Sequence, residues 1–154
     1  MAKGEQPDGD AATLDVLAAI EKFPSLRPDP EAFIKVLEPL RPRLFSIASS
    51  YRAGPGRVAL TVDHVRYAID GRERLGVAST FAGAALQPGD KVKVYIQRAH
   101  DFALPASGHT PIVMVGPGTG VAPFRAFLQE RMATKAKGPA WLFFGHQRRT
   151  TDFL

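Results

Sequence analysis

A glycine-rich segment contains the chain's clearest candidate for ligand chemistry. Residues 116–123 read Gly-Pro-Gly-Thr-Gly-Val-Ala-Pro, between an apolar run at 111–115 and a segment with helical apolar spacing at 122–133. Glycines let a ligand approach the backbone closely, and N–H groups at a helix start favour an anion such as a pyrophosphate. The segment lacks the lysine of a P-loop and is not G-x-G-x-x-G. The strand–loop–helix context favours phosphate binding, to which Thr119 adds a hydroxyl donor; a tight turn without a ligand is the alternative.

Two further segments contain residues that could bind an anion or a flat ring. On a strand, Arg43 could form charge-assisted bonds to phosphate, Phe45 could stack on a ring, and Ser46 could bond to the polar edge of that ring. The alternative is an edge-strand arginine beside a core phenylalanine. Residues 76–80, Gly-Val-Ala-Ser-Thr, place small residues and two hydroxyls at a predicted helix start. They form either a second anion nest or a simple N-cap.

Composition excludes several classes of site. The 154 residues contain no cysteine, so disulfides, cysteine-ligated metals and thiol catalysis are excluded. The spacing of the four histidines fits no metal site. The net charge is +5, but basic residues are scattered and not interleaved with aromatic ones, so we expect no nucleic-acid partner. No apolar run reaches the ~18 residues of a membrane span, and the polar start resembles no secretory signal. We expect a cytoplasmic protein without a membrane partner.

The apolar periodicity changes twice along the chain. Helical spacing at 13–23 and 29–37 is followed by short strands and turns, which predict a small antiparallel β-barrel. The predicted strands and turns are 44–47, 58–62, a bulge at 63–64, 65–67, a turn at 70–71, a turn at 88–90 and 92–96. Strand 111–115, helix 122–133 and strand 140–144 then form a βαβ unit. The fold class is thus β plus α/β, in four segments: a flexible tail at 1–11, a helical segment at 12–42, the barrel at 43–107 and an incomplete parallel α/β domain at 108–154.

Taken together, several segments resemble the ferredoxin–NADP reductase module of the diflavin reductases, and within them the flavoprotein subunits of NADPH-dependent sulfite reductases. These segments occur in the family's order, at residues 43–50, 60–62 with 65–67, 76–81, 113–131, 141–145 and 151–154. The resemblance implies an FAD-binding barrel followed by an NADP-binding domain, in which the flavin takes hydride from NADPH.

The resemblance also implies roles for individual residues. Arg43 would hold the FAD phosphate, with Leu44 beside it, and Phe45 stands where the family usually has a stacking Tyr. Ser46, the candidate catalytic residue, would lie near the flavin nitrogen that receives hydride. Asp63 replaces a small residue and adds a negative charge. The remaining implied FAD contacts are Thr61, Val62, Tyr67, Gly76, Val77, Ala78 and Ser79, and the implied NADPH contacts are Gly118, Thr119 and Gly120.

The resemblance covers only part of the family's length. The FMN-binding domain and the later part of the NADP domain, which reads the 2′-phosphate, have no counterpart in these residues, so the NADP site is incomplete. The implied partners are an FMN-domain acceptor and a sulfite reductase haemoprotein. Two functions stay open: an electron-transfer module, or a non-catalytic flavin- or nucleotide-binding fragment that complements another chain.

The predicted two-stranded parallel sheet has an open edge and an uncovered face. Parallel strands are normally buried on both faces. Residues 141–144, Trp-Leu-Phe-Phe, would therefore be poorly covered. We expect the last third of the chain to be marginally stable alone or to pair with another chain.

Overall fold

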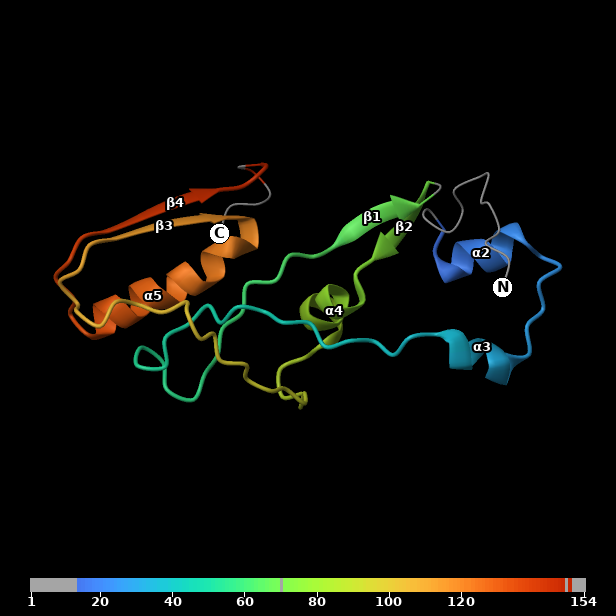
Figure 1. Cartoon of the computed structure of the whole chain (residues 1–154), viewed down its shortest axis with the longest axis horizontal. Helices are drawn as coiled ribbons and strands as arrows, with labels where there is room; N and C mark the ends of the chain where they lie inside the picture. The colour runs from blue at the N-terminus through green and yellow to red at the C-terminus, as the bar shows by residue number, and fades with distance from the viewer. Residues whose placement is uncertain (1–13, 70, 149, 151–154) are drawn as a thin grey trace. The chain divides into compact units, whose positions relative to one another are not determined.

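The computed structural model describes residues 14–69, 71–148 and 150. The chain divides into two compact units, each of which is described by itself. Unit 1 consists of Met1–Arg43 and Val65–Val77, and unit 2 of Leu44–His64 and Ala78–Leu154. The chain therefore enters unit 2, returns to unit 1 and enters unit 2 again. Figure 1 gives the order of the helices and strands along the chain.

The described part of unit 1 contains two short helices, each with an aspartate as its N-cap. Helix α2 spans Val16–Lys22 and α3 spans Pro30–Val36. The Asp15 carboxylate accepts a hydrogen bond from the N–H of Ala18 at 2.7 Å, and that of Asp29 from Ala32 at 3.0 Å. Such caps satisfy N–H groups that have no acceptor within the helix. The second cap confirms the predicted helix start. The first helix starts later than the predicted Thr13, which lies outside the described residues.

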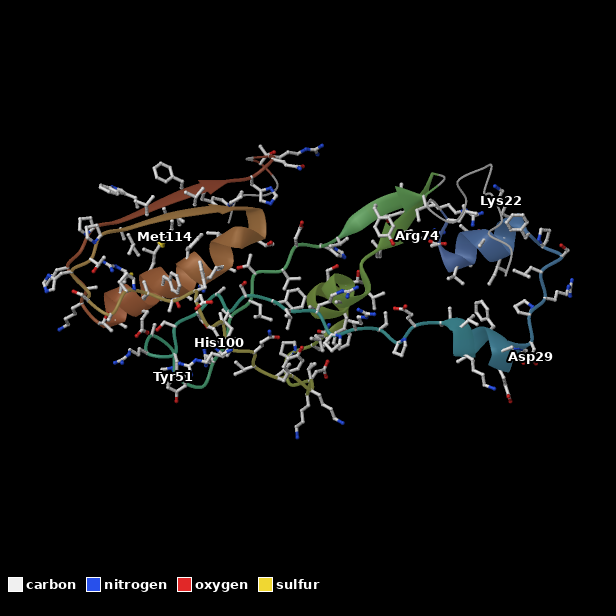
Figure 2. The ribbon with its side chains drawn as sticks, in the orientation of Figure 1. Lys22, Asp29, Tyr51, Arg74, His100 and Met114 are labelled. Atoms are coloured by element: carbon white, nitrogen blue, oxygen red, sulfur yellow. The ribbon has the colours of Figure 1, made fainter. Side chains whose placement is uncertain are left out.

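A β-hairpin, β1 (Arg66–Ile69) and β2 (Arg72–Leu75), completes unit 1. Ile69 pairs with Arg72, and Gly71 has a φ of 74°, which confirms the turn there; Asp70 lies outside the described residues. Arg72 and Arg74 lie on the same face of β2, because side chains alternate along a strand. Arg74 points from β2 toward α2 in Figure 2 and donates from Nε to Asp15 at 2.5 Å, while Arg72 pairs with Glu21.

The Arg74 guanidinium lowers the pKa of the Asp15 carboxyl, and the N–H of Ala18 lowers it further. The same hydrogen bond raises the pKa of Arg74. Both groups are therefore held in their charged forms. The hairpin is thus joined to the start of α2 by a charged pair, in addition to the backbone cap.

Unit 2 contains the predicted βαβ element. Strand β3 spans Ile112–Pro117, the 3-10 turn η2 spans Gly118–Val121, α5 spans Ala122–Ala133 and β4 spans Ala140–Gly145. The strands are parallel, with Val113 opposite Trp141 and Val115 opposite Phe143. Helix α5 lies along one face of this sheet (Figure 1). The predicted strand–helix–strand order and the helix bounds are confirmed.

The two faces of this sheet differ in burial. Met114, labelled in Figure 2, is 3% exposed and Gly116 is also buried, so their face of β3 is the covered one. The opposite face carries four apolar side chains that are 59–66% exposed: Val113, Val115, Trp141 and Phe143. The expectation that residues 141–144 would be poorly covered is confirmed for 141–143, whereas Phe144 is half-buried.

A buried arginine in the last turn of α5 bonds to backbone carbonyls of neighbouring segments. Arg131 is 7% exposed and donates to the carbonyls of Gly138, Thr110 and Gly108 at 2.5, 3.3 and 3.4 Å. These carbonyls belong to the segments before β3 and before β4. A cation at a helix C-terminus also interacts favourably with the helix dipole. Phe102 stacks on Phe127 with ring centroids 5.3 Å apart, which adds an aromatic contact to the same helix.

The predicted closed antiparallel barrel is absent from the described residues. Residues 44–47 and 58–62 meet only at an isolated bridge between Ile47 and Leu60, and residues 92–96 form no strand. The turn at 88–90 is present, with Gly89 at a φ of 101°. A barrel requires each strand to be paired on both sides. The alternating apolar residues Val94 and Ile96 are 83% and 75% exposed, so no burial holds them in a strand.

Candidate functional site

The predicted FAD residues are divided between the two units. Arg43, Tyr67, Gly76 and Val77 belong to unit 1, whereas the predicted contacts at 44–46, 61–63 and 78–79 belong to unit 2. The glycine loop, 118–120, also belongs to unit 2. The residues expected at the flavin ring therefore share a compact unit with those expected at the second nucleotide.

In unit 2, hydrogen bonds join the two segments expected at the flavin ring. The N–H of Ala48 donates to the carbonyl of Ala59 at 2.8 Å, and the N–H of Ala59 donates to Ser49 Oγ at 2.8 Å. These bonds continue the bridge between Ile47 and Leu60. They hold the end of segment 44–48 beside the start of segment 61–63.

The side chains of these two segments remain accessible. Phe45 is 37% exposed, and Leu44, Ser46 and Asp63 are also exposed. Thr61 and Val62 are half-buried. An aromatic face, hydroxyl groups and a carboxylate are thus available to a ligand on neighbouring segments.

The predicted FAD contacts of unit 1 are also accessible. Arg43 is exposed, and Tyr67, on β1, is 51% exposed. The N–H of Gly76 donates to the carbonyl of Val65 at 2.8 Å, so the hairpin pairing extends to the start of the Gly-Val-Ala-Ser-Thr segment. Val77 is exposed, whereas Ala78 is half-buried.

That segment forms helix α4, Val77–Thr80, followed by the π-helical turn η1, Phe81–Ala85. The predicted helix start is therefore confirmed, although α4 itself is a single turn. Ser79 is 6% exposed, and Thr80 Oγ1 lies 3.2 Å from Nε2 of His64. A bound anion at this position stays a prediction.

Helix packing and backbone conformation explain two glycines of the loop that follows β3. A Cβ at Gly116 would lie 2.7 Å from Phe124 Cδ2 and 2.8 Å from the carbonyl oxygen of Gly120. Gly118 has a φ of 54°, a conformation that side-chain-bearing residues rarely adopt. The loop then enters the 3-10 turn, whose Thr119 carbonyl accepts from the N–H of Ala122. These two glycines are therefore required by the fold itself.

The fold itself does not require a glycine at position 120. A Cβ there would lie 3.7 Å from Pro117 Cδ, an ordinary contact, and its φ is not in the left-handed region. Gly120 and Thr119 are both exposed, at the carboxyl end of β3. The absence of a side chain at 120 leaves open backbone on the outside of the turn. The first N–H groups of the turn have no acceptor within it, so the loop has the donors and the open backbone that a pyrophosphate requires.

His146 is a neighbour of this loop that sequence reasoning did not select. It follows β4, and its Nε2 lies 3.7 Å from the position of a Cβ at Gly118. Its Nδ1 accepts from the N–H of Gln147 at 2.9 Å, so the neutral ring carries its proton on Nε2. One sequence feature could have identified His146: it directly follows the second parallel strand. The carboxyl ends of parallel strands meet at the same edge of a sheet, so residues after β3 and β4 lie close together.

Metal-binding clusters and membrane-spanning helices are both absent from the described part of the chain. Residues 14–69, 71–148 and 150 contain no group of three or more histidine, aspartate or glutamate residues that could hold a metal ion. Among these residues, no helix has the length and apolarity needed to cross a membrane.

Comparison with known proteins finds two domain families along the chain. Residues 9–81 match the FAD binding domain family, and residues 114–154 match the oxidoreductase NAD-binding domain family. The chain is 49% identical over 140 residues to the sulfite reductase [NADPH] flavoprotein alpha-component of Bacillus subtilis. It is 47% identical over 152 residues to that of Klebsiella pneumoniae, and 46% over 152 residues to that of Escherichia coli K12.

The chain is a partial homologue of the sulfite reductase flavoprotein alpha-component. The match to the Bacillus subtilis relative covers 91% of this chain and 23% of that relative. The match to the Klebsiella pneumoniae relative covers 95% of this chain and 25% of that relative. The chain thus spans about a quarter of the length of the curated relatives it matches. Its resemblance to the reductase module of this flavoprotein family is confirmed.

Proposed function

We propose that this chain supplies the flavin-to-nicotinamide contact of a sulfite-reductase-type electron-transfer flavoprotein. The observation that carries this proposal is the common location of two predicted site regions. Segments 44–48 and 59–63 and the glycine loop at 118–120 lie in one compact unit that also contains α5. The two domain-family matches support FAD at the first region and a nicotinamide dinucleotide at the second.

The proposed FAD contacts follow from side-chain chemistry. The exposed Arg43 guanidinium would hold a phosphate by charge-assisted hydrogen bonds. Phe45 would stack on the flavin ring, and the Ser46 hydroxyl would bond to the ring nitrogen that receives hydride. Other contacts would come from Leu44, Thr61, Val62, Asp63, Tyr67, Gly76, Val77, Ala78 and Ser79. We propose that these residues belong to a complete FAD-binding β-barrel when the rest of the family's module is present.

The proposed dinucleotide contacts come from the glycine loop. Gly118, Thr119 and Gly120 would bind the NADPH pyrophosphate through backbone N–H groups and the threonine hydroxyl. Bound NADPH would supply a hydride and bound FAD would accept it. The protein's own contribution is to hold the two rings in contact and to exclude water between them. The acceptors beyond the flavin would be an FMN domain and a sulfite reductase haemoprotein, as in the relatives' family.

Anaerobic mixing separates the two functions that the sequence left open. The purified chain, loaded with FAD, is mixed with NADPH while the visible absorption of oxidised flavin is followed. An electron-transfer module loses this absorption, whereas a non-catalytic fragment binds FAD and keeps it. A chain that binds neither FAD nor NADP⁺ contradicts both functions. Adding the missing part of the NADP domain as a separate chain then tests whether the fragment acts by complementation.

Two glycine variants test the dinucleotide site directly. Gly118→Ala should destabilise unit 2 by about 1–2 kcal/mol, because it forces alanine into the left-handed region. Gly120→Ala should leave the free energy of unfolding unchanged, since its Cβ meets only an ordinary contact at 3.7 Å. We expect Gly120→Ala nevertheless to weaken NADP⁺ binding about tenfold, by blocking the close approach of the pyrophosphate. Unaltered NADP⁺ affinity in this variant would contradict the proposed loop contact.

A further inference from the structure

A group of polar contacts, which we call the polar clasp, joins residues 48–53 to helix α5. Arg125 Nη1 donates to the carbonyl of Ala48 at 2.6 Å, and the N–H of Ser50 donates to Gln129 Oε1 at 3.0 Å. The hydroxyl of Ser50 donates to Glu130 Oε2 at 2.5 Å. Arg125 and Gln129 are one helical turn apart and therefore lie on the same face of α5. These contacts join residues 77 to 80 positions apart in the sequence.

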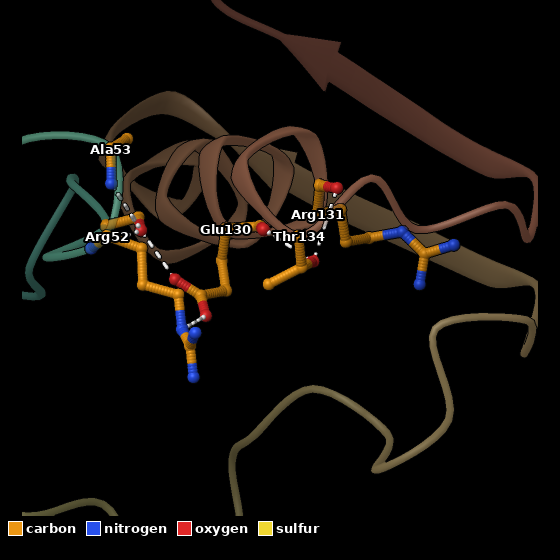
Figure 3. A network of polar contacts seen from close by, with 6 residues as sticks. Arg52, Ala53, Glu130, Arg131 and Thr134 are labelled. Atoms are coloured by element: carbon orange, nitrogen blue, oxygen red, sulfur yellow. Dashed lines mark hydrogen bonds and ion pairs between the residues drawn. The ribbon is translucent and has the colours of Figure 1, made fainter.

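Ser50 and Glu130 form the centre of the clasp. Ser50 is 5% exposed, and its Oγ also accepts hydrogen bonds from the N–H groups of Arg52 and Ala53 at 3.1 and 3.3 Å. Arg52 Nε lies 2.8 Å from the second oxygen of Glu130. Figure 3 shows Glu130 reaching from α5 to Arg52 and its neighbours. Since both Glu130 oxygens have a partner on one turn, that turn has a single favoured position on the helix.

The clasp links the two predicted nucleotide regions, because it joins residues 48–53 to helix α5. On one side, Ala48 is 1% exposed and bonded to Ala59, which holds the segments that carry Phe45 and Thr61. On the other side, α5 starts at Ala122, directly after the glycine loop. A displacement of residues 48–53 along α5 would therefore change the distance from Phe45 to Gly118.

We propose that Arg125, Gln129 and Glu130 are positioning residues that set the distance between the flavin ring and the nicotinamide. The proposal rests on the proposed function and extends it to residues that would touch neither nucleotide. Hydride transfer depends steeply on the separation of donor and acceptor, and a misplacement of about 1 Å can cost about 100-fold in rate. A clasp of this kind would therefore affect the transfer rate more than either binding constant.

The first test compares hydride transfer with binding. Gln129→Ala combined with Glu130→Ala should slow anaerobic flavin reduction about tenfold or more. The dissociation constants for FAD and NADP⁺, measured separately, should stay within about twofold of wild type, because no proposed nucleotide contact is removed. Glu130→Gln keeps an oxygen that accepts from the Ser50 hydroxyl, and should restore most of the rate. Glu38→Gln, which alters an exposed ion pair with Arg41, is the matched control and should behave as wild type.

The second test needs no nucleotide. Because the chain contains no cysteine, Arg57→Cys and Met132→Cys provide two specific spin-label positions. Both residues are exposed; Arg57 lies four residues after the clasped segment 48–53, and Met132 lies on α5. The clasp predicts one narrow distance distribution in the otherwise unaltered chain and a broad one after Gln129→Ala with Glu130→Ala. Glu130→Gln should retain the narrow distribution.

Each alternative outcome has a defined meaning. An unchanged distance distribution in the double alanine variant, or an unchanged transfer rate, overturns the positioning role. Parallel loss of FAD affinity and folding stability also overturns it, since that pattern identifies a structural contact only. If the wild-type chain does not bind FAD, the proposed function fails, and the label distances alone decide whether the clasp holds the segment on α5.

Discussion

Unit 2 contains every buried residue of the described chain, whereas the described part of unit 1 has none. The buried side chains of unit 2 are apolar at Ala48, Met114, Val121 and Ala122 and polar at Ser50, Ser79 and Arg131. Helices α2 and α3 contain no buried residue, and β1 and β2 are half-buried at best. The contacts that join the hairpin to α2 are instead charged pairs near the surface.

This difference indicates that the two units are held together by different forces. In unit 2, the segments are held by buried residues and by part-buried hydrogen bonds, which salt screens less than exposed ion pairs. The hairpin of unit 1, which contains Tyr67, is joined to α2 by partly exposed ion pairs, which contribute modestly and are screened by salt. We therefore expect substitutions in unit 2 to have larger effects on stability than those in unit 1.

The largest effect should come from Arg131. Arg131→Met removes the donor to three carbonyls while keeping a side chain of similar length. We expect the free energy of unfolding of unit 2 to fall by about 3 kcal/mol, because buried carbonyls lose charged partners. Urea unfolding followed by Trp141 fluorescence measures it. Arg98→Met, at an exposed arginine, is the control, and an equal effect of both variants would contradict the role assigned to Arg131.

The second-largest effect should come from substitutions on the covered face of β3, compared with those on its exposed face. Met114→Ala empties space between the sheet and α5 and should cost about 2 kcal/mol. Val113→Thr changes the exposed face, keeps the strand preference and should alter the free energy of unfolding by less than about 0.5 kcal/mol. The same urea experiment compares them. If Val113→Thr destabilises as much as Met114→Ala, the exposed face of the sheet is covered in solution, as pairing with another chain would require.

The smallest effect should be the acid response of unit 1. Because the folded-state pKa of Asp15 is lowered, its charged pair contributes stability above the carboxyl's unfolded pKa and loses it as the pH falls through the folded value. The protection factor of the Ala18 amide, which corrects the exchange rate for its intrinsic pH dependence, should therefore fall on acidification below about pH 4. Asp15→Asn keeps a capping oxygen and should remove most of this pH dependence.

Asp29→Asn, at the cap of α3, is the matched control for that experiment. Its Ala32 amide reports the effect of replacing a capping carboxylate. Added salt should weaken the Asp15 effect, because the Arg74 pair is partly exposed. A pH response that persists in Asp15→Asn would assign it to another group and remove the charged pair as its cause.

Local sequence patterns predicted an element correctly where residues nearby in the sequence make its backbone hydrogen bonds. Asp29 with Pro30 predicted a helix start, and the apolar run, the glycine loop and the helical spacing after it predicted the strand β3, the turn and helix α5. The apolar run also suggested a strand buried on both faces, but one face of β3 is exposed. The same kind of pattern was wrong at 92–96, where alternating Val and Ile residues remain exposed and unpaired as a strand. A strand requires a partner for its N–H and C=O groups, and alternation specifies a face without supplying that partner.

The sequence by itself determined the Asp29 helix cap, the βαβ element, the glycine loop and the family resemblance, because each depends on residues close together or on a motif preserved in order. Only the tertiary structure decided that Ser50 meets Glu130, that Arg131 bonds to three carbonyls, and that His146 lies beside Gly118. Such pairings depend on how distant segments pack in space, and polar side chains far apart in the chain carry no local signal of their partners.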